Sequence, residues 1–268
     1  MWFILRIPDE EVQQAIDMFN NGMSITKIAK QLGRDRGTLS IRMKTAGANI
    51  VQHCNKKSVN SNFFNDWNEK SAYWLGFIFA DGHLTEDGGL DICIKDKKHI
   101  EKFKADIKSD HKIGIKTINE TDYYRINIRD KTIAARLKEL GVVHNKTYGW
   151  TIPNIPNKYM NHFIRGLYDG DGNLNVKTKG STTFRIVCYD RVVLESLMET
   201  IKYNVEETAG HIRIYEYDYR VPELNISSTK ALESFLKWLY KDATVYLDRK
   251  YKKYLDYCRL EPRGQWRL

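Results

Sequence analysis

The stretch that decides the fold is FIRGLYDGDGNL, from Phe163 to Leu174, where an apolar, helix-like run ends in aspartates interleaved with glycines. The chain carries a near copy of it, WLGFIFADGHL, from Trp74 to Leu84. When the two stretches are superimposed, Asp81 matches Asp171. A pattern that occurs twice in register predicts the duplication of a whole subdomain.

Small residues recur at matching places in the two copies. Gly76 and Ala80 are four positions apart, as are Gly166 and Gly170, so each pair lies on one face of a helix. A glycine inside a helix costs about 1 kcal/mol relative to alanine, which indicates that close packing requires it. We therefore expect two helices that pack against each other, backbone to backbone, at these four residues.

Asp81 and Asp171 would lie side by side at the C-terminal ends of these helices. The helix dipole places about half a negative charge there, so two neighbouring carboxylates need a cation. Oxygen ligands with room for water and phosphate suit Mg²⁺, although other divalent metals are possible, and such a site is suited to phosphodiester hydrolysis. The alternative is a pair of helix-end aspartates in glycine turns, without metal; the doubled motif favours the metal. Gly82 and Gly172 are expected in the left-handed conformation that ends a helix.

Each copy is followed by the same order of elements. A strand-like run comes first, then an aspartate and an amphipathic helix, then further strands and another helix. The matching segments are LDICIK and FRIVCY, Asp96 and Asp190, YRINIR and PELNIS. This order predicts an α+β fold of two halves, residues 71–152 and 153–268, each reading helix, hairpin, helix, hairpin, helix. The second half would also include a basic C-terminal helix.

The segments WLGFIFADG and IRGLYDGDG closely resemble the two motifs of single-chain LAGLIDADG homing endonucleases, and the resemblance covers Ser71 to about Tyr257. It implies two pseudo-symmetric αββαββα repeats whose sheets form a DNA-binding saddle over the major groove. It also implies that Asp81 and Asp171 are catalytic and bind the metal, that the target is a long, specific double-stranded DNA site, and that the enzyme belongs to a mobile genetic element. Asp169 matches a motif position that is not catalytic and is expected to be structural.

Basic side chains near the metal are a further implication of this resemblance. Lys95 and Arg129, near strand ends of the first half, are the candidate catalytic residues. The alternative for both is a solvated strand edge or a phosphate contact. The matching positions of the second half, Tyr189 and Ser227, are not basic, which leaves open how evenly the two strands are cut.

Residues 1–50 predict a separate, all-α domain of three short helices. Ser24 can cap the second helix, which Gly33 closes, and the third helix is expected from about Arg36 to Lys44. The arrangement resembles a resolvase-like helix-turn-helix, whose third helix enters the major groove. The residues expected to contact DNA are Arg36, Thr38, Ser40, Arg42 and Lys44. The alternative is a three-helix bundle that serves packing or dimerisation.

Residues 51–70 are rich in Asn, Ser and Lys and predict a linker. Three aromatic residues near its end are expected to anchor it on the next domain. They are Phe63, Phe64 and Trp67.

The composition agrees with a nucleic-acid partner. The 268 residues carry a formal net charge of +9, and basic proteins favour polyanions. Lys146, Arg249 and Lys250 are expected to add phosphate contacts. Four cysteines without C-x-x-C spacing argue against a zinc site and a disulfide framework. No apolar run approaches the roughly 18 residues of a membrane span, so a soluble, cytoplasmic protein without a membrane partner is expected.

Three functions stay open from the sequence. The first is a site-specific, metal-dependent double-strand DNA endonuclease. The second is a catalytically inactive DNA-binding regulator with the same fold, although a pure binder has no use for two carboxylates facing phosphates. The third is an intron RNA-splicing cofactor, which a helix-turn-helix suited to B-form grooves disfavours. A monomer is expected, because the duplication supplies within one chain the symmetry that single-motif relatives obtain by dimerising.

Overall fold

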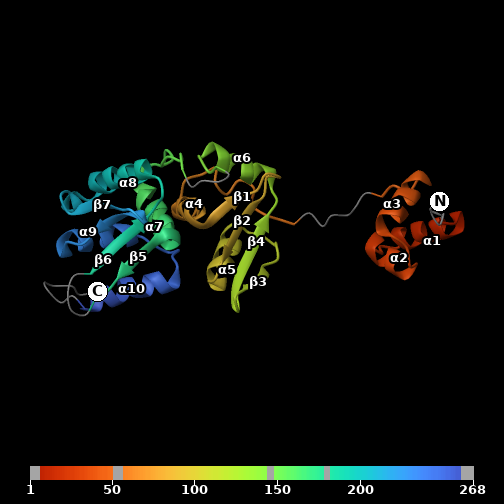
Figure 1. Ribbon diagram of the computed structural model, residues 1–268. Coiled ribbons are helices and arrows are strands. Elements are labelled where there is room, and N and C mark those ends of the chain that lie inside the picture. Colours follow the sequence, from red (N-terminus) through yellow and green to blue (C-terminus); the bar gives the residue numbers. More distant parts are fainter. Residues whose placement is uncertain (1–6, 51–56, 144–147, 178–181, 261–268) are drawn as a thin grey trace. The chain divides into compact units, whose positions relative to one another are not determined.

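A computed structural model describes residues 7–50, 57–143, 148–177 and 182–260 of the chain (Figure 1). The chain divides into two compact units, Met1–Lys56 and Lys57–Leu268, and each has its own apolar core. Among the helices of these described ranges, none combines the length and the apolar character that crossing a bilayer requires.

The first unit is built from three helices at the predicted positions: α1 (Asp9–Asn20), α2 (Ile25–Gln31) and α3 (Arg36–Thr45). Ser24 caps α2, as predicted, by accepting a hydrogen bond from the backbone N–H of Lys27. Its core includes Val12, Ala15, Ile28, Leu39 and Met43. The Arg34 guanidinium bonds both carboxylate oxygens of Glu11 at 2.7 Å and so fastens the turn before α3 to α1.

The second unit confirms the α+β class and the duplicated order of elements. The first half contains α4 (Glu69–Asp81), β1 (Gly82–Leu84), β2 (Leu90–Ile94), α5 (Lys97–Asp106), β3 (Gly114–Ile118), β4 (Thr121–Ile128) and α6 (Lys131–Glu139). The second half contains η1 (Asn157–Tyr159), α7 (Met160–Asp171), β5 (Gly172–Asn175), β6 (Thr183–Val187), α8 (Arg191–Asn204), η2 (Glu206–Thr208), β7 (Ile212–Tyr217), β8 (Arg220–Ile226), α9 (Thr229–Tyr240) and α10 (Asp248–Leu260).

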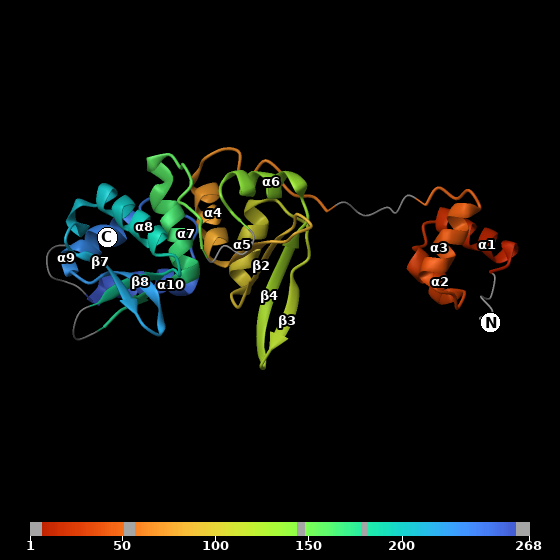
Figure 2. The ribbon, with the colours of Figure 1, turned by 45° about the horizontal axis from the view of Figure 1, so that its top comes forward.

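Each half folds its strands into a four-stranded antiparallel sheet, in the order β1-β2-β4-β3 and β5-β6-β8-β7. Alternating burial gives each sheet one covered and one open face: Leu90, Ile92 and Ile94 are buried in β2, whereas Asp91 and Cys93 between them lie on the other face. Figures 1 and 2 show α4 and α7 side by side between the two sheets. The two motifs therefore lie at the centre of this unit.

The expected linker is shorter than its composition suggests. From Lys57 onward the chain belongs to the second unit, where the backbone N–H of Asp110 donates to Ser58 O and that of Asn60 to Ile107 O. Phe63 and Phe64 are buried in the core, as predicted for aromatic anchors. Polar side chains in this segment satisfy backbone groups of the unit, and for that reason their abundance misleads.

Candidate active site

The two motif helices touch at their glycines. A Cβ atom added to Gly76 would lie 2.0 Å from the carbonyl oxygen of Phe163, and one added to Gly166 would lie 2.0 Å from that of Tyr73. Real Cβ atoms never come so near to a backbone oxygen, so only glycine permits this crossing. Phe163 and Tyr73 are themselves ninety positions apart, like Asp171 and Asp81, and the contact is therefore pseudo-symmetric.

Asp81 and Asp171 are the last residues of α4 and α7. A Cβ atom added to Gly170 would lie 2.2 Å from the Ala80 Cβ and 3.3 Å from an Oδ2 oxygen of Asp81. The carboxylate of Asp81 thus leans over the end of the opposite helix. The structure brings the two motif ends together, and both carboxylates experience the negative ends of the two helix dipoles.

Gly82 and Gly172 do not adopt the left-handed conformation that the sequence suggested. Their φ, ψ values are −84°, 156° and −101°, 170°, which is extended backbone, and each begins a strand directly after its helix. Crowding explains the glycines instead. A Cβ at Gly82 would lie 2.8 Å from the carbonyl oxygen of Ile78, and one at Gly172 would lie 2.3 Å from the Tyr168 ring. The immediate reversal from helix to strand is what holds each aspartate at the site.

Lys250 is buried, so its expected place among the surface charges of the C-terminal helix is wrong. Its ammonium group donates to the carbonyl oxygens of Tyr168 at 2.5 Å and Gly170 at 3.3 Å, which would otherwise lack partners at the end of α7. Burial lowers the pKa of Lys250 to about 8. Among the charges that oppose this shift are those of Asp81 and Asp171. A lysine of the second half therefore lies beside the motif carboxylates.

A periodicity signal could have identified Lys250 in advance. It lies three residues after Leu247 and four before Tyr254, which is the spacing of the apolar face of an amphipathic helix. Leu247 and Tyr257 on this face are buried. The run RKYKKY looks like a solvated cluster of charges because its composition, rather than its spacing, draws attention.

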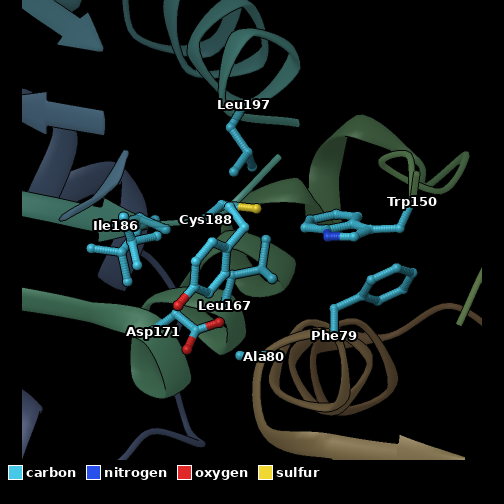
Figure 3. Close-up of a pocket in the computed structure, with 11 residues that line it drawn as sticks. Phe79, Ala80, Trp150, Leu167, Asp171, Ile186, Cys188 and Leu197 are labelled. Atoms are coloured by element: carbon cyan, nitrogen blue, oxygen red, sulfur yellow. The ribbon is translucent and has the colours of Figure 1, made fainter. Parts of the chain in front are cut away.

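A cavity of about 260 Å³ borders Asp171. Figure 3 shows Phe79 and Trp150 on one side of it and Ile186 and Cys188 on the other. Burial raises the pKa of the Cys188 thiol, and the charge of Asp171 acts in the same direction, so the thiol stays protonated. The surroundings of Asp171 are therefore more apolar than those of the Lys250 ammonium.

Lys95 and Arg129 lie at opposite ends of the first sheet. The Lys95 ammonium lies 5.3 Å from the ring centre of Tyr123, whereas Arg129 forms an ion pair with Asp87 at 3.3 Å. Tyr123 and Arg129 are six residues apart along β4 and its end, which corresponds to about 20 Å. The structure does not bring these two predicted catalytic residues together, and Arg129 belongs to the β1–β2 turn instead.

The other residues predicted to contact DNA fall into different environments. On α3, Arg36, Thr38 and Lys44 are exposed and Ser40 is half-buried. Arg42 is also half-buried and bonds Asp9 at 2.6 Å. Arg249 pairs with Asp96 at 3.1 Å, and Lys146 lies outside the described residues.

The donor set fits a hard divalent cation with few protein ligands. Within the part of the chain that the structure describes, no three His, Cys, Asp or Glu side chains gather closely enough to enclose a metal ion. Asp81 and Asp171 supply carboxylate oxygens only, and Mg²⁺ commonly completes such a shell with water and phosphate oxygens. The two residues could therefore hold metal only together with a substrate or solvent.

The fold is the LAGLIDADG fold. The homing endonuclease I-WcaI bound to its DNA recognition sequence superimposes with a TM-score of 0.52 at 12% identity, over 72% of this chain and 90% of that chain. The N-terminal LAGLIDADG domain of DUF199/WhiA gives 0.44 at 16% identity, over 69% and 86%. I-SmaMI bound to an uncleaved DNA target in the presence of calcium ions gives 0.49 at 14% identity, over 74% and 95%.

Sequence comparison is less informative. No family model matches the chain. An uncharacterized protein of Methanocaldococcus jannaschii is 26% identical over 155 residues, which is 54% of this chain and 54% of the relative. The match thus spans about half the length of that relative.

Proposed function

We propose that this chain is a site-specific, divalent-metal-dependent endonuclease that cuts both strands of DNA, of the homing type. The observation that carries the proposal is the crossing of α4 and α7 at Gly76 and Gly166, which places Asp81 and Asp171 at one end of the helix pair. Two carboxylates at negative helix ends are unfavourable in a protein that has no cation to bind there.

Asp81 and Asp171 are proposed to hold Mg²⁺, which when bound activates water and stabilises the leaving oxygen. Each carboxylate must stay ionised and fixed in direction, and the helix-to-strand reversals at Gly82 and Gly172 provide the fixed direction. Lys250 brings a positive charge to the same place. That charge favours the approach of a phosphate and opposes the repulsion between the two carboxylates.

The open faces of the two sheets are proposed to contact the DNA. In the second sheet, Asn173, Arg185 and Asn225 lie in register on neighbouring strands, and Arg213 extends the row to the fourth strand. Asparagine and arginine are the side chains that pair with adenine and guanine edges in the major groove. The matching row of the first sheet begins with His83 and Asp91. The two halves of the target are therefore proposed to differ in sequence.

The first unit is proposed to bind DNA through α3 and so to lengthen the contact with the target. Its charged residues add phosphate contacts, which raise affinity without determining where the second unit cuts.

The test is cleavage of a randomised duplex library, with Mg²⁺ or with Ca²⁺, read by sequencing the ends. The chain should produce discrete ends that share a long motif with Mg²⁺ only. Asp81→Asn and Asp171→Asn should abolish double-strand cleavage and leave binding in Ca²⁺ largely intact. Asp256→Asn removes a carboxylate that pairs with Arg259 at 3.4 Å on α10 and is the matched control; it should cut like the unaltered chain.

The outcomes separate the alternatives. Full cutting by both motif variants would exclude the proposed chemistry. Sequence-specific binding without cut ends would instead support a DNA-binding regulator. A preference for structured RNA over duplex DNA would support a splicing cofactor.

A further inference from the structure

The two sides of the α4–α7 pair differ in chemistry although the helices are copies. On one side lie two residues of each helix, which we call the polar seam: Glu69, Tyr73, Arg165 and Asp169. The residues ninety positions away from these are apolar or aromatic, and we call them the apolar seam: Tyr159, Phe163, Leu75 and Phe79. In the apolar seam, Phe79 packs edge-on against Phe163 at 5.7 Å.

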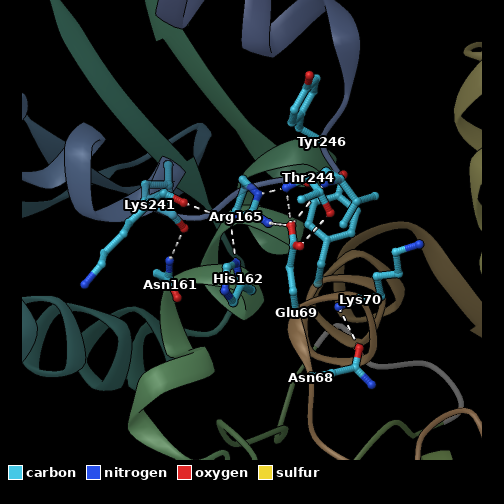
Figure 4. A network of polar contacts seen from close by, with 12 residues as sticks. Asn68, Glu69, Lys70, Asn161, His162, Arg165, Lys241, Thr244 and Tyr246 are labelled. Atoms are coloured by element: carbon cyan, nitrogen blue, oxygen red, sulfur yellow. Dashed lines mark hydrogen bonds and ion pairs between the residues drawn. The ribbon is translucent and has the colours of Figure 1, made fainter. Parts of the chain in front are cut away.

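Arg165 is the centre of the polar seam and has no exposed surface. Its guanidinium bonds Glu69 at 3.0 Å and donates to the carbonyl oxygens of Val245 at 3.0 Å and Leu239 at 2.9 Å. Figure 4 shows this network around Glu69 and Thr244. Both backbone carbonyls belong to the chain around the end of α9, so the guanidinium joins that segment to both motif helices.

Glu69 binds the same segment from the first half. Its carboxylate accepts hydrogen bonds from the backbone N–H and the hydroxyl of Thr244, and from the backbone N–H of Val245 at 3.1 Å. Glu69 is the first residue of α4, and Thr244 is 175 positions further along the chain. The start of the first motif helix therefore directly orders the loop that follows α9.

Asp169 fixes the next part of this loop. One of its carboxylate oxygens accepts from the Tyr73 hydroxyl at 2.6 Å and from the backbone N–H of Leu247 at 2.8 Å. Three residues later, the Lys250 ammonium bonds the end of α7. The segment from Thr244 to Lys250 is thus held at successive points along the helix pair.

We propose that Glu69, Arg165 and Asp169 are positioning residues that set the location of Lys250 relative to Asp81. The inference rests on the proposed endonuclease function. Lys250 and the Asp81 carboxylate both approach Gly170, so a displacement of the loop changes the distance between the two charges. A displacement of about 1 Å in such a site can lower a rate about a hundredfold.

The apolar seam has no carboxylate or guanidinium that could hold a loop in this way. The environment of Asp171 is instead the apolar cavity with Trp150 and Cys188. Damage to the polar seam should therefore slow the cut at the Asp81 centre more than the cut at the Asp171 centre. The expected sign is a nick in one defined strand.

The test uses Glu69→Gln, which keeps the side-chain length and removes the charge, and Tyr73→Phe, which removes the hydroxyl that bonds Asp169. Phe163→Leu is the control, because Phe163 occupies the position in the apolar seam that Tyr73 occupies in the polar seam. Each full-length protein is incubated with a supercoiled plasmid that carries the site found by library cleavage, and labelled ends identify the strand that is cut.

Glu69→Gln should slow the cut of one strand about tenfold or more relative to the other, so that nicked plasmid accumulates. Tyr73→Phe should favour the same strand less strongly. Phe163→Leu should not enrich that nick. If Glu69→Gln slows both strands equally, the polar seam only stabilises the fold and the proposal is overturned.

A second measurement needs neither DNA nor activity. Hydrogen exchange of the free protein should show faster exchange at the amides of Thr244, Val245 and Leu247 in Glu69→Gln, and unchanged exchange there in Phe163→Leu. Unchanged exchange in Glu69→Gln would contradict the positioning role even if cutting is uneven. Failure of the unaltered chain to cut any site contradicts the proposed function and with it the positioning role, whatever the exchange shows.

Discussion

Lys250 has a charge where the surrounding side chains are mostly apolar. Its ammonium is stabilised by the carbonyls of Tyr168 and Gly170 and by nearby carboxylates, against the loss of hydration. Such a group is retained only where the gain in function or specificity offsets its burial, and a lysine beside metal-binding carboxylates is a site of that kind.

Replacement of this lysine should separate binding from cutting. Lys250→Met keeps most of the length and removes the charge, so we expect the cleavage rate to fall about a hundredfold. Affinity for the site in Ca²⁺ should change only a few-fold, because the ammonium does not lie on the open face of a sheet. Single-turnover cleavage and a binding titration measure the two quantities.

Lys252 on the same helix is exposed and serves as the control. Lys252→Met should cut at the rate of the unaltered chain. Equal losses in the two variants would show that the site senses only the total charge of α10.

Two buried histidines should make folding sensitive to acid. Burial lowers the pKa of His99 to about 3, helped by Lys102, Arg249 and Lys250, and lowers that of His162 to about 4. Both are neutral in the folded chain, whereas in the unfolded chain they take up protons below about pH 6.5. The free energy of unfolding should therefore fall as the pH drops from about 6.5, by about 1 kcal/mol for each histidine at pH 5.5.

Urea unfolding at pH 7.5 and 5.5 measures this loss. His99→Gln, which can still bond the Tyr73 hydroxyl, should lose less stability between the two pH values than the unaltered chain. His211 is exposed, and His211→Gln should behave like the unaltered chain. An identical loss in all three proteins would contradict the assignment.

At the scale of elements, the helix pair was predictable because its signals are local. Residues four apart on one helix face, such as Gly76 and Ala80, report close packing, and the helix, strand and helix order followed from short apolar patterns. The left-handed glycines were wrong because the helices pass directly into strands, and turn chemistry depends on that context. The polar seam was out of reach, since Glu69 and Thr244 meet across 175 positions.

The crossing should tolerate no added methyl group. Gly166→Ala would gain about 1 kcal/mol in helix propensity, but its Cβ would lie 2.6 Å from the backbone nitrogen of Phe77 in addition to its contact with Tyr73. Backbone atoms on a packed helix cannot move independently, so we expect a net loss of about 1–3 kcal/mol or more. Calorimetric unfolding of the second unit measures it.

Gly37 in α3 provides the comparison. A Cβ there meets only a carboxylate oxygen of Asp35, at 3.2 Å, and that side chain can move. Gly37→Ala should be neutral or stabilising for the first unit. A stable Gly166→Ala protein would mean that the two helices can separate without loss of the fold.

At the scale of the whole molecule, the net charge of +9 is shared between two units with separate cores. If both units contact phosphates, the affinity for DNA must fall steeply with salt, and each contact contributes to the slope.

The contribution of the first unit can be measured on the full chain. Replacing both Arg36 and Lys44 by glutamine should make the slope of log affinity against log salt shallower by about 2. The position of the cut should not change. Replacing both Lys131 and Lys138, which are exposed on α6, should leave the slope nearly unchanged, and equal effects of the two double variants would contradict a specific DNA contact by α3.

The difference between the two seams has a consequence for ancestry. Two copies of the first half, paired through α4, would set Glu69 against Leu75 or Phe79 and leave a buried carboxylate without its guanidinium. Two copies of the second half would strand Arg165 in the same way. An unpaired buried charge destabilises by about 3–5 kcal/mol. Once these substitutions were in place, neither half could return to life as a symmetric dimer, and the fused chain became the smallest heritable unit of the fold.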